Sequence, residues 1–491
     1  MSEQSAGRAA AQPAGIAAEQ TLPWRAMLGI SLGVFMATVD MSIVNITLPT
    51  LMVELGVSLA TVEWVILSYA LVVTSLMLGV ARLGDMLGKK RVYLWGLAVF
   101  TMGSLLCGAA PGAYALIVFR GLQALGAVMM QALGVAIITD IVPPSRRGRA
   151  LGLMGSVVAL GLSVGPPLGG LIIGLVGWRA IFLVNVPVGI LALAVVRRHI
   201  PADVPARGGQ TFDAAGALIL FLTLVCYALG MTMGQHGGFS SPSVLGLLAL
   251  AVLGLGVFLR VQAVKSQPMV DLSMFRQGRF SLGLLMGWIC FLLMGGAFIL
   301  PLFLQMARGY APQHVGLLMM VVPVSMGMIS PWAGSLSDRY GSRLISLLGL
   351  LVLAGGCLTI SGIDEYTDAW GYILRVAPMG LGMGLFQSPN NSAIMGAAPR
   401  ERLGLAGGLL ALSRTLGTTT GLPLLGAFFS ARVEAAAGLP AHSDLAQAAA
   451  TALAAGVRAT YLLSTALALA AAGLALGLLL AERRKGRPAL D

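Results

Sequence analysis

Runs of about 20 mostly apolar residues follow one another along this chain, and this repetition constrains its fold more than any other feature. A helix of that length crosses a bilayer with its backbone hydrogen bonds made internally. Charged residues are only 10% of the 491, whereas a soluble domain carries about 25%. The sequence predicts an all-α polytopic membrane protein with fourteen spans. They are expected at 26–51, 61–83, 92–110, 114–139, 149–175, 179–197, 212–233, 242–262, 280–305, 314–336, 344–361, 370–397, 404–430 and 457–481.

The basic residues predict how these spans are oriented. Of the 31 Lys and Arg residues, 24 fall in loops or tails on one side of the fourteen spans and four on the other. The remaining three, Arg120, Arg375 and Arg414, lie inside spans. By the positive-inside rule both termini are cytoplasmic, in a multi-pass protein of the cell membrane. Because the basic residues form no separate domain, we expect no nucleic-acid partner.

Two loops carry the same pattern and indicate an internal repeat. Residues 81–91 and 334–343 both read small-x-Leu-small-Asp-x-x-Gly-x-basic. The glycines permit a tight turn, the Asp can cap the next helix, and the basic end lies at the headgroups. An ordinary basic loop would explain either copy alone, but two copies at matching positions favour a repeated transporter fold. The gating residues predicted from these loops are Asp85, Gly88, Asp338, Arg339 and Gly341.

The repeat divides the chain into parts. Two six-helix halves are expected, with two inserted helices between them, because internal repeats of this kind are typical of transporter folds. The predicted parts are a disordered tail at 1–24, an N-terminal half at 25–200, two inserted helices at 201–265, a C-terminal half at 266–482 and a basic tail at 483–491.

Further motifs support a family resemblance. They are Asp40–Pro49 in the first span, Arg120–Gly126 in the fourth, Gly161–Gly170 in the fifth, and the shorter Trp178-Arg179, Asn185–Gly189 and Phe212-Asp213. With the repeated loops, they resemble the major facilitator superfamily. The fourteen-span count is similar to its drug:H⁺ antiporter-2 (EmrB/QacA-like) branch. That resemblance implies a proton-coupled exporter of small molecules.

The first repeated loop departs from the family pattern at two positions. Ala81 replaces the usual Gly, and Met86 replaces the usual Arg after Asp85. We therefore expect the first loop to be a weaker gate latch than the second.

Asp40 is the only carboxylate well inside any expected span, and charged groups at membrane depth are costly and usually functional. A lone, partly wetted Asp can change protonation state, as a proton carrier must. The resemblance implies that Arg120 is the proton-coupling arginine that interacts with this acid. A structural hydrogen bond or a static pair remains an alternative. Asp140 and Asp213 lie at helix ends, where capping is expected.

The fifth span is glycine-rich. Gly161, Gly165 and Gly169 recur every four residues and form a smooth packing face, while Pro166 removes a backbone donor and bends the helix. With Gly170 they resemble the antiporters' motif C, which implies a role in sealing or flexing the outer gate. Ordinary helix packing is the alternative.

The expected substrate cavity is apolar with a few amides, which suits varied hydrophobic ligands. Its predicted residues are Asn45, Gln123, Gln131, Phe298, Gln305, Gln387 and Asn391. Because Asp40 is the only deep acid, neutral or monocationic substrates are expected. The arginines inside spans leave an anionic substrate open, and Arg414 needs a partner that the sequence does not name.

Other functions are less consistent with the sequence. No phosphate-binding G-x-x-x-x-G-K-[ST] pattern, metal-ligand pattern or catalytic motif is present, so we expect no ATP, no cofactor, no metal site and no enzyme activity. The partners predicted are a small hydrophobic or monocationic substrate, protons and the lipid bilayer. A dedicated exporter of one natural product or lipid is an alternative. A non-transporting scaffold is another, although it has no use for Asp40 and Arg120.

Overall fold

The computed structural model describes residues 23–57, 59–201, 213–266, 268–296, 299–310, 312–399, 402–440 and 448–484. Within these ranges every regular element is a helix. The helices are α2 (Trp24–Leu55), α3 (Leu59–Leu87), α4 (Lys89–Gly108), α5 (Ala113–Ile141), η1 (Pro144–Arg146), α6 (Arg147–Val176), α7 (Ala180–Leu183), α8 (Asn185–His199), α9 (Ala214–Gly237), α10 (Pro242–Val264), η2 (Leu272–Arg276), α11 (Gly278–Gly295), α12 (Ile299–Met306), α13 (Pro312–Met319), α14 (Val321–Tyr340), α15 (Ser342–Ile360), α16 (Ala369–Ala397), α17 (Leu403–Ala437) and α18 (Ala450–Arg484).

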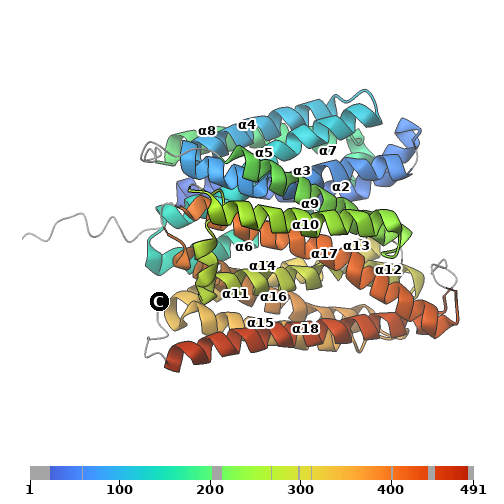
Figure 1. Ribbon diagram of the computed structural model, residues 1–491. Coiled ribbons are helices and arrows are strands. Elements are labelled where there is room, and N and C mark those ends of the chain that lie inside the picture. Colours follow the sequence, from blue (N-terminus) through green and yellow to red (C-terminus); the bar gives the residue numbers. More distant parts are fainter. Residues whose placement is uncertain are drawn as a thin grey trace, which may run out of the picture.

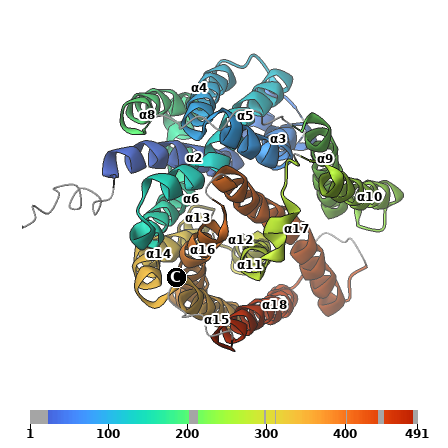
Figure 2. The same ribbon diagram turned by 60° about the vertical axis from the view of Figure 1, so that its left-hand side comes forward.

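The long helices run roughly side by side in one bundle (Figure 1). The helices from α2 to α8 lie together at one side, and those from α11 to α18 at the other. Helix α6 of the first group and helix α17 of the second lie where the two groups meet. Helices α9 and α10 form a pair at the edge of the bundle (Figure 2). Helix α6 packs against α14, and α17 against α3, so each group supplies a helix that contacts the other.

The expected count of fourteen spans is not confirmed. Within the described ranges, twelve helical segments are long and apolar enough to cross a membrane. Helices α16 and α17, with 29 and 35 residues, are not among them. Both carry polar side chains in their middle, including Gln387, Asn391 and Arg414, which lower mean hydropathy although they face other helices. Hydropathy measures composition and does not register which side of a helix is buried.

Two expected spans are interrupted within the described residues. The sixth is the short α7 followed by α8, and the tenth is α13 followed by α14. The ninth contains α11 and α12, and residues 297–298 between them lie outside the described ranges. Breaks at membrane depth are tolerated where neighbouring helices surround the freed backbone groups. The break between α7 and α8 places Asn185, the first residue of α8, inside the bundle, where it is 3% exposed.

The pair α9 and α10 is held by one buried carboxylate. Asp213 accepts hydrogen bonds from the backbone N–H of Gly216 and from Gln262 Nε2, at 2.8 and 2.7 Å, and pairs with Lys265. The predicted capping role of Asp213 is therefore confirmed. Burial by itself would raise the pKa of Asp213, but the hydrogen bonds from Lys265, Gln262 and Gly216 outweigh it and leave that pKa below its usual value.

This pair also contacts both groups of helices. Helix α9 packs against α3 and α17. The Tyr227 hydroxyl of α9 hydrogen-bonds the hydroxyl of Thr420 on α17. Helices α9 and α10, which the sequence analysis expects to be an insertion, therefore lie beside the line along which the two groups meet (Figure 2).

Candidate functional site

Asp40 and Arg120 form an ion pair in the interior. Asp40 on α2 is 0% exposed and Arg120 on α5 is 1% exposed, and Arg120 Nη1 lies 2.6 Å from Asp40 Oδ2. The other carboxylate oxygen accepts hydrogen bonds from Gln123 Nε2 at 2.9 Å and Asn185 Nδ2 at 3.0 Å. Asp40 thus has three donors around it. Each oxygen of this carboxylate therefore has at least one hydrogen-bond donor, and one of the donors is the charged guanidinium of Arg120.

The guanidinium of Arg120 is held on several sides. Its Nη1 also donates to Gln123 Oε1 at 2.7 Å, and its Nε donates to the backbone oxygen of Val65 at 3.2 Å. The Tyr69 ring lies 4.3 Å and the Phe182 ring 5.7 Å from the guanidinium carbon. Aromatic faces attract a cation and exclude water. Arg120 therefore has a fixed position that a flexible ammonium would not reproduce.

Two members of this cluster were missed as site residues by sequence reasoning. Asn185 was quoted in a motif without a role, and the hydroxyl of Ser104, on α4, accepts from Gln123 Nε2 at 2.8 Å. Both are polar residues next to apolar runs, and that was the available signal. The structure brings the predicted Gln123 into this cluster instead of an open cavity.

Two other predicted residues are not among the donors described for Asp40. Gln131 is on α5, eight positions beyond Gln123, and is partly buried. Asn45 lies in α2, but its side chain is outside the described part of the structure. No hydrogen bond to Asp40 is therefore assigned to either residue.

The repeated loops hold the two groups of helices together. Asp85 accepts from the backbone N–H groups of Gly404 and Leu405, both at 2.8 Å, and we name this contact the first latch. Asp338 accepts from Gly148 N–H at 2.9 Å and Arg149 N–H at 3.0 Å, which we name the second latch. Each carboxylate thus caps the first turn of a helix in the other group, α17 or α6.

These contacts correct the expectation that each Asp caps the next helix. The N-cap positions of α4 and α15 are Gly88 and Gly341, and neither has a side-chain cap. Both glycines have positive φ, 100° and 87°, so the expected glycine turn is present. Asp140, expected to be a cap, instead pairs with Lys89. Arg339 is exposed and lies against the Tyr340 ring.

The second latch continues as a close helix contact. A Cβ atom added to Gly334 of α14 would lie 2.1 Å from the backbone oxygen of Gly148 on α6. Farther along, Ser156 donates to the backbone oxygen of Gly327 at 2.7 Å. The same Gly148 oxygen accepts a hydrogen bond from the Ser388 hydroxyl of α16 at 3.0 Å. The groups are therefore in contact from the latched end towards the middle of the bundle.

The glycine face predicted in the fifth span packs against α2. Cβ atoms added to Gly161, Gly165 and Gly169 would lie within 3 Å of α2 side chains. Gly170 faces open space instead, and nothing is described for the Pro166 side chain. Ser42 of α2 donates to Gly161 oxygen at 3.3 Å. This contact places the glycine face next to the helix that carries Asp40.

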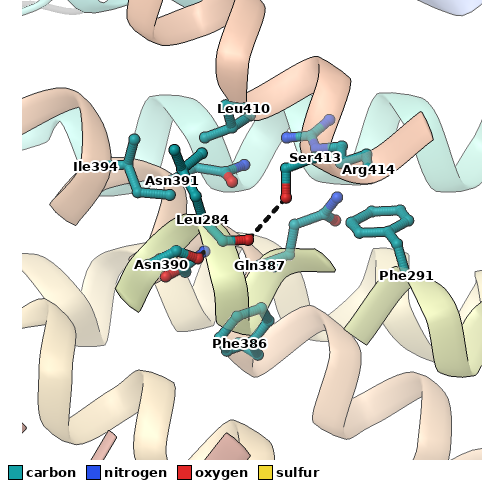
Figure 3. A pocket seen from close by; sticks show the side chains of 12 residues that line it. Leu284, Phe291, Phe386, Gln387, Asn390, Asn391, Ile394, Leu410, Ser413 and Arg414 are labelled. Carbon is teal, nitrogen blue, oxygen red and sulfur yellow. Dashed lines mark hydrogen bonds between the residues drawn. The ribbon is translucent and has the colours of Figure 1, made fainter. Parts of the chain in front are cut away.

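A second polar site lies among α11, α16 and α17. Figure 3 shows Arg414 and Ser413 of α17 facing Gln387 and Asn391 of α16, with Phe291 at one end. The pocket has a volume of about 10 Å³, close to that of one water molecule. Its twelve lining residues are Gly283, Leu284, Gly287, Phe291, Phe386, Gln387, Asn390, Asn391, Ile394, Leu410, Ser413 and Arg414.

Only two of the predicted cavity residues that the structure describes line this pocket. Gln387 and Asn391 line it, at 5% and 7% exposure, together with Arg414, for which the sequence named no partner. Gln305 on α12 is exposed and does not line it, and Phe298 is outside the described residues.

A wider hollow of about 450 Å³ is lined by Thr61, Trp64, Tyr114 and Ile117, near the first turns of α3 and α5. Val65, whose backbone oxygen binds Arg120, directly follows Trp64. The hollow therefore lies about one helical turn from Arg120, since Ile117 precedes that residue by three positions.

The comparisons with known proteins agree with this architecture. The sequence profile of the Major Facilitator Superfamily matches residues 30–422 and, a second time, residues 298–490. The chain belongs to the major facilitator superfamily. Proteins with this family and fold are membrane transporters and are generally not enzymes.

Several bacterial proteins are similar in sequence to most of this chain. The riboflavin transporter RibZ of Clostridioides difficile is 34% identical over 409 residues, which cover 83% of this chain and 88% of RibZ. The multidrug resistance protein Stp of Mycobacterium tuberculosis is 30% identical over 413 residues, covering 83% of this chain and 76% of Stp. Multidrug and antibiotic resistance transporters are thus among its relatives.

The fold of this superfamily member is also found in a solved structure. The human organic anion transporter MFSD10 superposes with a TM-score of 0.66, covering 93% of this chain and 100% of the human chain, at 16% identity. At that identity the similarity establishes the fold and says nothing about the substrate.

Proposed function

We propose that this protein is a proton-coupled exporter of hydrophobic small molecules, in the fourteen-span drug:H⁺ antiporter-2 branch of its superfamily. The single observation that carries the proposal is the buried pair of Asp40 and Arg120, with Gln123 and Asn185 as further donors. Burying charges is expensive, and a protein that only needed stability would gain little from such a pair. The fourteen spans include α16 and α17, whose polar faces are turned into the bundle.

Proton binding at Asp40 would change what Arg120 and Gln123 bond to. A neutral carboxyl loses most of its attraction for the guanidinium and can itself donate a proton. Arg120 would then depend on Gln123 and the Val65 oxygen alone. Because Asp40 lies on α2, beside the glycine face of α6, a change in its bonding can alter how these two helices pack. This links protonation to helix movement.

The latches supply the second part of the proposed mechanism. With both termini cytoplasmic, the ends of α3 and α14 that carry Asp85 and Asp338 face the cytoplasm. Two closed latches at that side correspond to a state that faces outward, in which the hollow near Trp64 would admit protons. Export requires the latches to open, so that substrate can enter from the cytoplasm.

A second candidate function is the dedicated export of one natural product. The similarity to RibZ, a protein named for one compound, favours it. The two functions share the same proton site and differ in the breadth of substrates. A lipid substrate is less favoured, because the pocket near Arg414 presents several amides.

The proposal is tested in inverted membrane vesicles acidified by respiration, with a dye that reports the internal pH. Addition of an exported compound should release protons from the vesicles. A panel of hydrophobic drugs that releases none, although the protein is present and folded, would refute proton coupling. A broad panel of active compounds supports a multidrug exporter, and a single active compound a dedicated one.

Orientation is tested in the same cells. A cysteine replacing Ser240, in the loop between α9 and α10, should react with an impermeant maleimide added to intact cells in a variant without native cysteines. A cysteine replacing Ser145, before α6, serves as the control and should stay unlabelled. The reverse pattern would contradict the proposed orientation.

A further inference from the structure

Arg414 is a partly buried cation that faces the pocket among α11, α16 and α17. It lies in the first half of α17, and no carboxylate among the described residues forms an ion pair with it. Its described side-chain contact is the Phe291 ring, whose centroid lies 5.7 Å from the guanidinium carbon. The described carboxylates from α11 to α18 all lie in loops or near helix ends. Among the described residues of these helices, no carboxylate is therefore placed to balance the charge of Arg414.

The neighbours of Arg414 also lack partners. Gln387 is 5% exposed, its Oε1 has no hydrogen-bond partner, and its amide makes no bond among the described residues. Asn391 is 7% exposed, and its amide also makes no hydrogen bond among the described residues. Buried amides in proteins are nearly always bonded. Two unbonded amides beside an unpaired guanidinium indicate a site built for a group that is not part of the chain.

The other polar side chains of the pocket are already used. Ser413 donates to the Leu284 backbone oxygen at 2.8 Å (Figure 3), and Asn390 Nδ2 donates to the Gly283 oxygen at 3.1 Å. These bonds fix the walls of the pocket and leave Arg414, Gln387 and Asn391 as the free recognition groups. The orientation of an amide can reverse, so Gln387 and Asn391 are both able to donate.

Charge and hydrogen-bonding capacity together define the ligand group. A guanidinium and two amides offer many N–H donors, and a carboxylate accepts up to two of them in parallel without donating any. A neutral carbonyl would accept hydrogen bonds but leave the charge of Arg414 unbalanced. A cation would be repelled. The side chains of Phe291, Phe386 and Ile394 surround the polar groups with apolar surface, which suits an aromatic body.

We propose that the pocket among α11, α16 and α17 binds the carboxylate of an aromatic organic anion, with Arg414 as its charged anchor and Gln387 and Asn391 as its neutral donors. The proposal deepens the proposed function and rests on it, since it names the substrate class of the exporter. It departs from the sequence-based expectation of a neutral or monocationic substrate. The volume of about 10 Å³ admits no such molecule in the latched state, so binding requires α11, α16 and α17 to separate.

The test is a binding measurement on the purified protein with two dyes that share a xanthene ring. Fluorescein carries a carboxylate, whereas in rhodamine 123 this group is a methyl ester and the dye is a cation. We expect saturable fluorescein binding by fluorescence anisotropy, weakened at least about 10-fold by Arg414→Gln and less by Arg414→Lys. Rhodamine 123 binding should be unchanged or tighter in Arg414→Gln.

Arg375→Gln is the matched control. Arg375 is also inside a predicted span, but its Nη1 donates to the Gly371 backbone oxygen and it does not line the pocket. Fluorescein binding by this variant should equal that of the wild type. Gln387→Met, which keeps the size of the side chain and removes its donors, should weaken fluorescein binding about threefold.

Thermal unfolding distinguishes recognition from a structural role. An unpaired buried cation is destabilising, so the ligand-free Arg414→Gln protein should unfold at a higher temperature than the wild type. Fluorescein should stabilise the wild type and not the variant. A structural arginine would give a lower unfolding temperature in Arg414→Gln, and that result would overturn the proposal.

Two further outcomes also overturn it. One is a wild type that shows no saturable fluorescein binding, or an Arg414→Gln variant that binds fluorescein as tightly. The other is a lysine variant no better than the glutamine variant, which would assign the effect to shape. Because binding is measured without a proton gradient, failure here is distinct from failure of proton coupling, which the vesicle assay reports.

Discussion

The two groups of helices differ in how the charged side chains within their spans are partnered. Among α2 to α8, Asp40 and Arg120 are paired at 2.6 Å and bonded to neighbours on α3, α5 and α8. Among α11 to α18, Arg414 has an aromatic ring beside it and no ion pair with any carboxylate that the structure describes. In the proposed mechanism, the charges of Asp40 and Arg120 balance each other, whereas Arg414 attracts an anion from outside. The proposals therefore assign proton coupling to the first group of helices and ligand recognition to the second.

The two repeated loops, by comparison, have the same structure in both groups of helices. Both repeated loops turn at a glycine with positive φ, and both place an Asp on two backbone N–H groups of a helix in the other group. Repetition has thus preserved the parts that hold the groups together, while the charged residues inside each group differ. This is the pattern expected when one fold serves two separate tasks.

Loss of the Asp40 carboxylate should have the largest effect on transport and should distinguish the two groups of helices most clearly. Asp40→Asn should lower proton-driven export at least about 100-fold, because the amide cannot take up and release a proton near neutral pH. Arg414→Gln should retain proton antiport with rhodamine 123. The measurement is proton release from acidified inverted vesicles on addition of the dye.

The same variant should also be less stable. Removing one partner of a buried pair costs about 3–5 kcal/mol, so the unfolding temperature of Asp40→Asn should fall. The double variant Asp40→Asn with Arg120→Gln should recover stability but not export. Export by either variant at the wild-type rate would contradict the role of Asp40 in proton transfer.

The latches should give an intermediate effect. Asp338→Ala or Asp85→Ala removes a helix cap worth about 1 kcal/mol and should increase opening at the latched end about fivefold. A cysteine replacing Ser388, which is 2% exposed and bonded to Gly148 across the groups, reports opening by its rate of maleimide labelling. Asp140→Ala is the control, because Asp140 pairs with Lys89 within one group.

The two latches also allow a direct comparison. Their hydrogen bonds are equally short, at 2.8 Å in the first and 2.9 and 3.0 Å in the second. Equal effects are therefore expected. A distinctly smaller effect of Asp85→Ala would instead support the sequence-based expectation that Ala81 and Met86 weaken the first latch.

The membrane potential should have the smallest effect on export. This effect should differ between an anionic and a cationic substrate. Exchange of an anion leaving for a proton entering moves positive charge inward, whereas exchange of a monocation for a proton moves none. Dissipating an inside-negative potential should therefore slow fluorescein export about twofold and leave rhodamine 123 export unchanged. The rates are compared in proteoliposomes with valinomycin and set potassium gradients. Equal slowing of both dyes would contradict transport of fluorescein as an anion.

Part of the site was predictable because its signal is local. Asp40 was recognised as a carboxylate inside an apolar run, and Gly88 and Gly341 as turn residues beside a repeated Asp. The approach of Asp40 to Arg120 was expected from a family resemblance, since the two are 80 positions apart. Asn185 and Ser104 were not assigned, because a single polar residue in an apolar segment does not indicate which neighbour it will meet.

The errors have the same origin. Asp85 was expected to cap the helix that follows it, but it caps α17, which begins more than 300 positions later. Gln305 was expected in the cavity and is exposed on α12. In each case the deciding contact is between segments distant in sequence.

The sequence by itself determined that this chain is helical and membrane-embedded, and where its loops turn. These properties follow from local composition, because each apolar run must satisfy its own backbone in lipid. Only the tertiary structure decided which polar groups meet. Asp40 is bonded to three donors, whereas Arg414 has no ion pair within the part of the chain that the structure describes. The residues next to each of them in the sequence predict neither outcome. Partnership between buried charges depends on how distant helices pack, and that is set by the whole bundle.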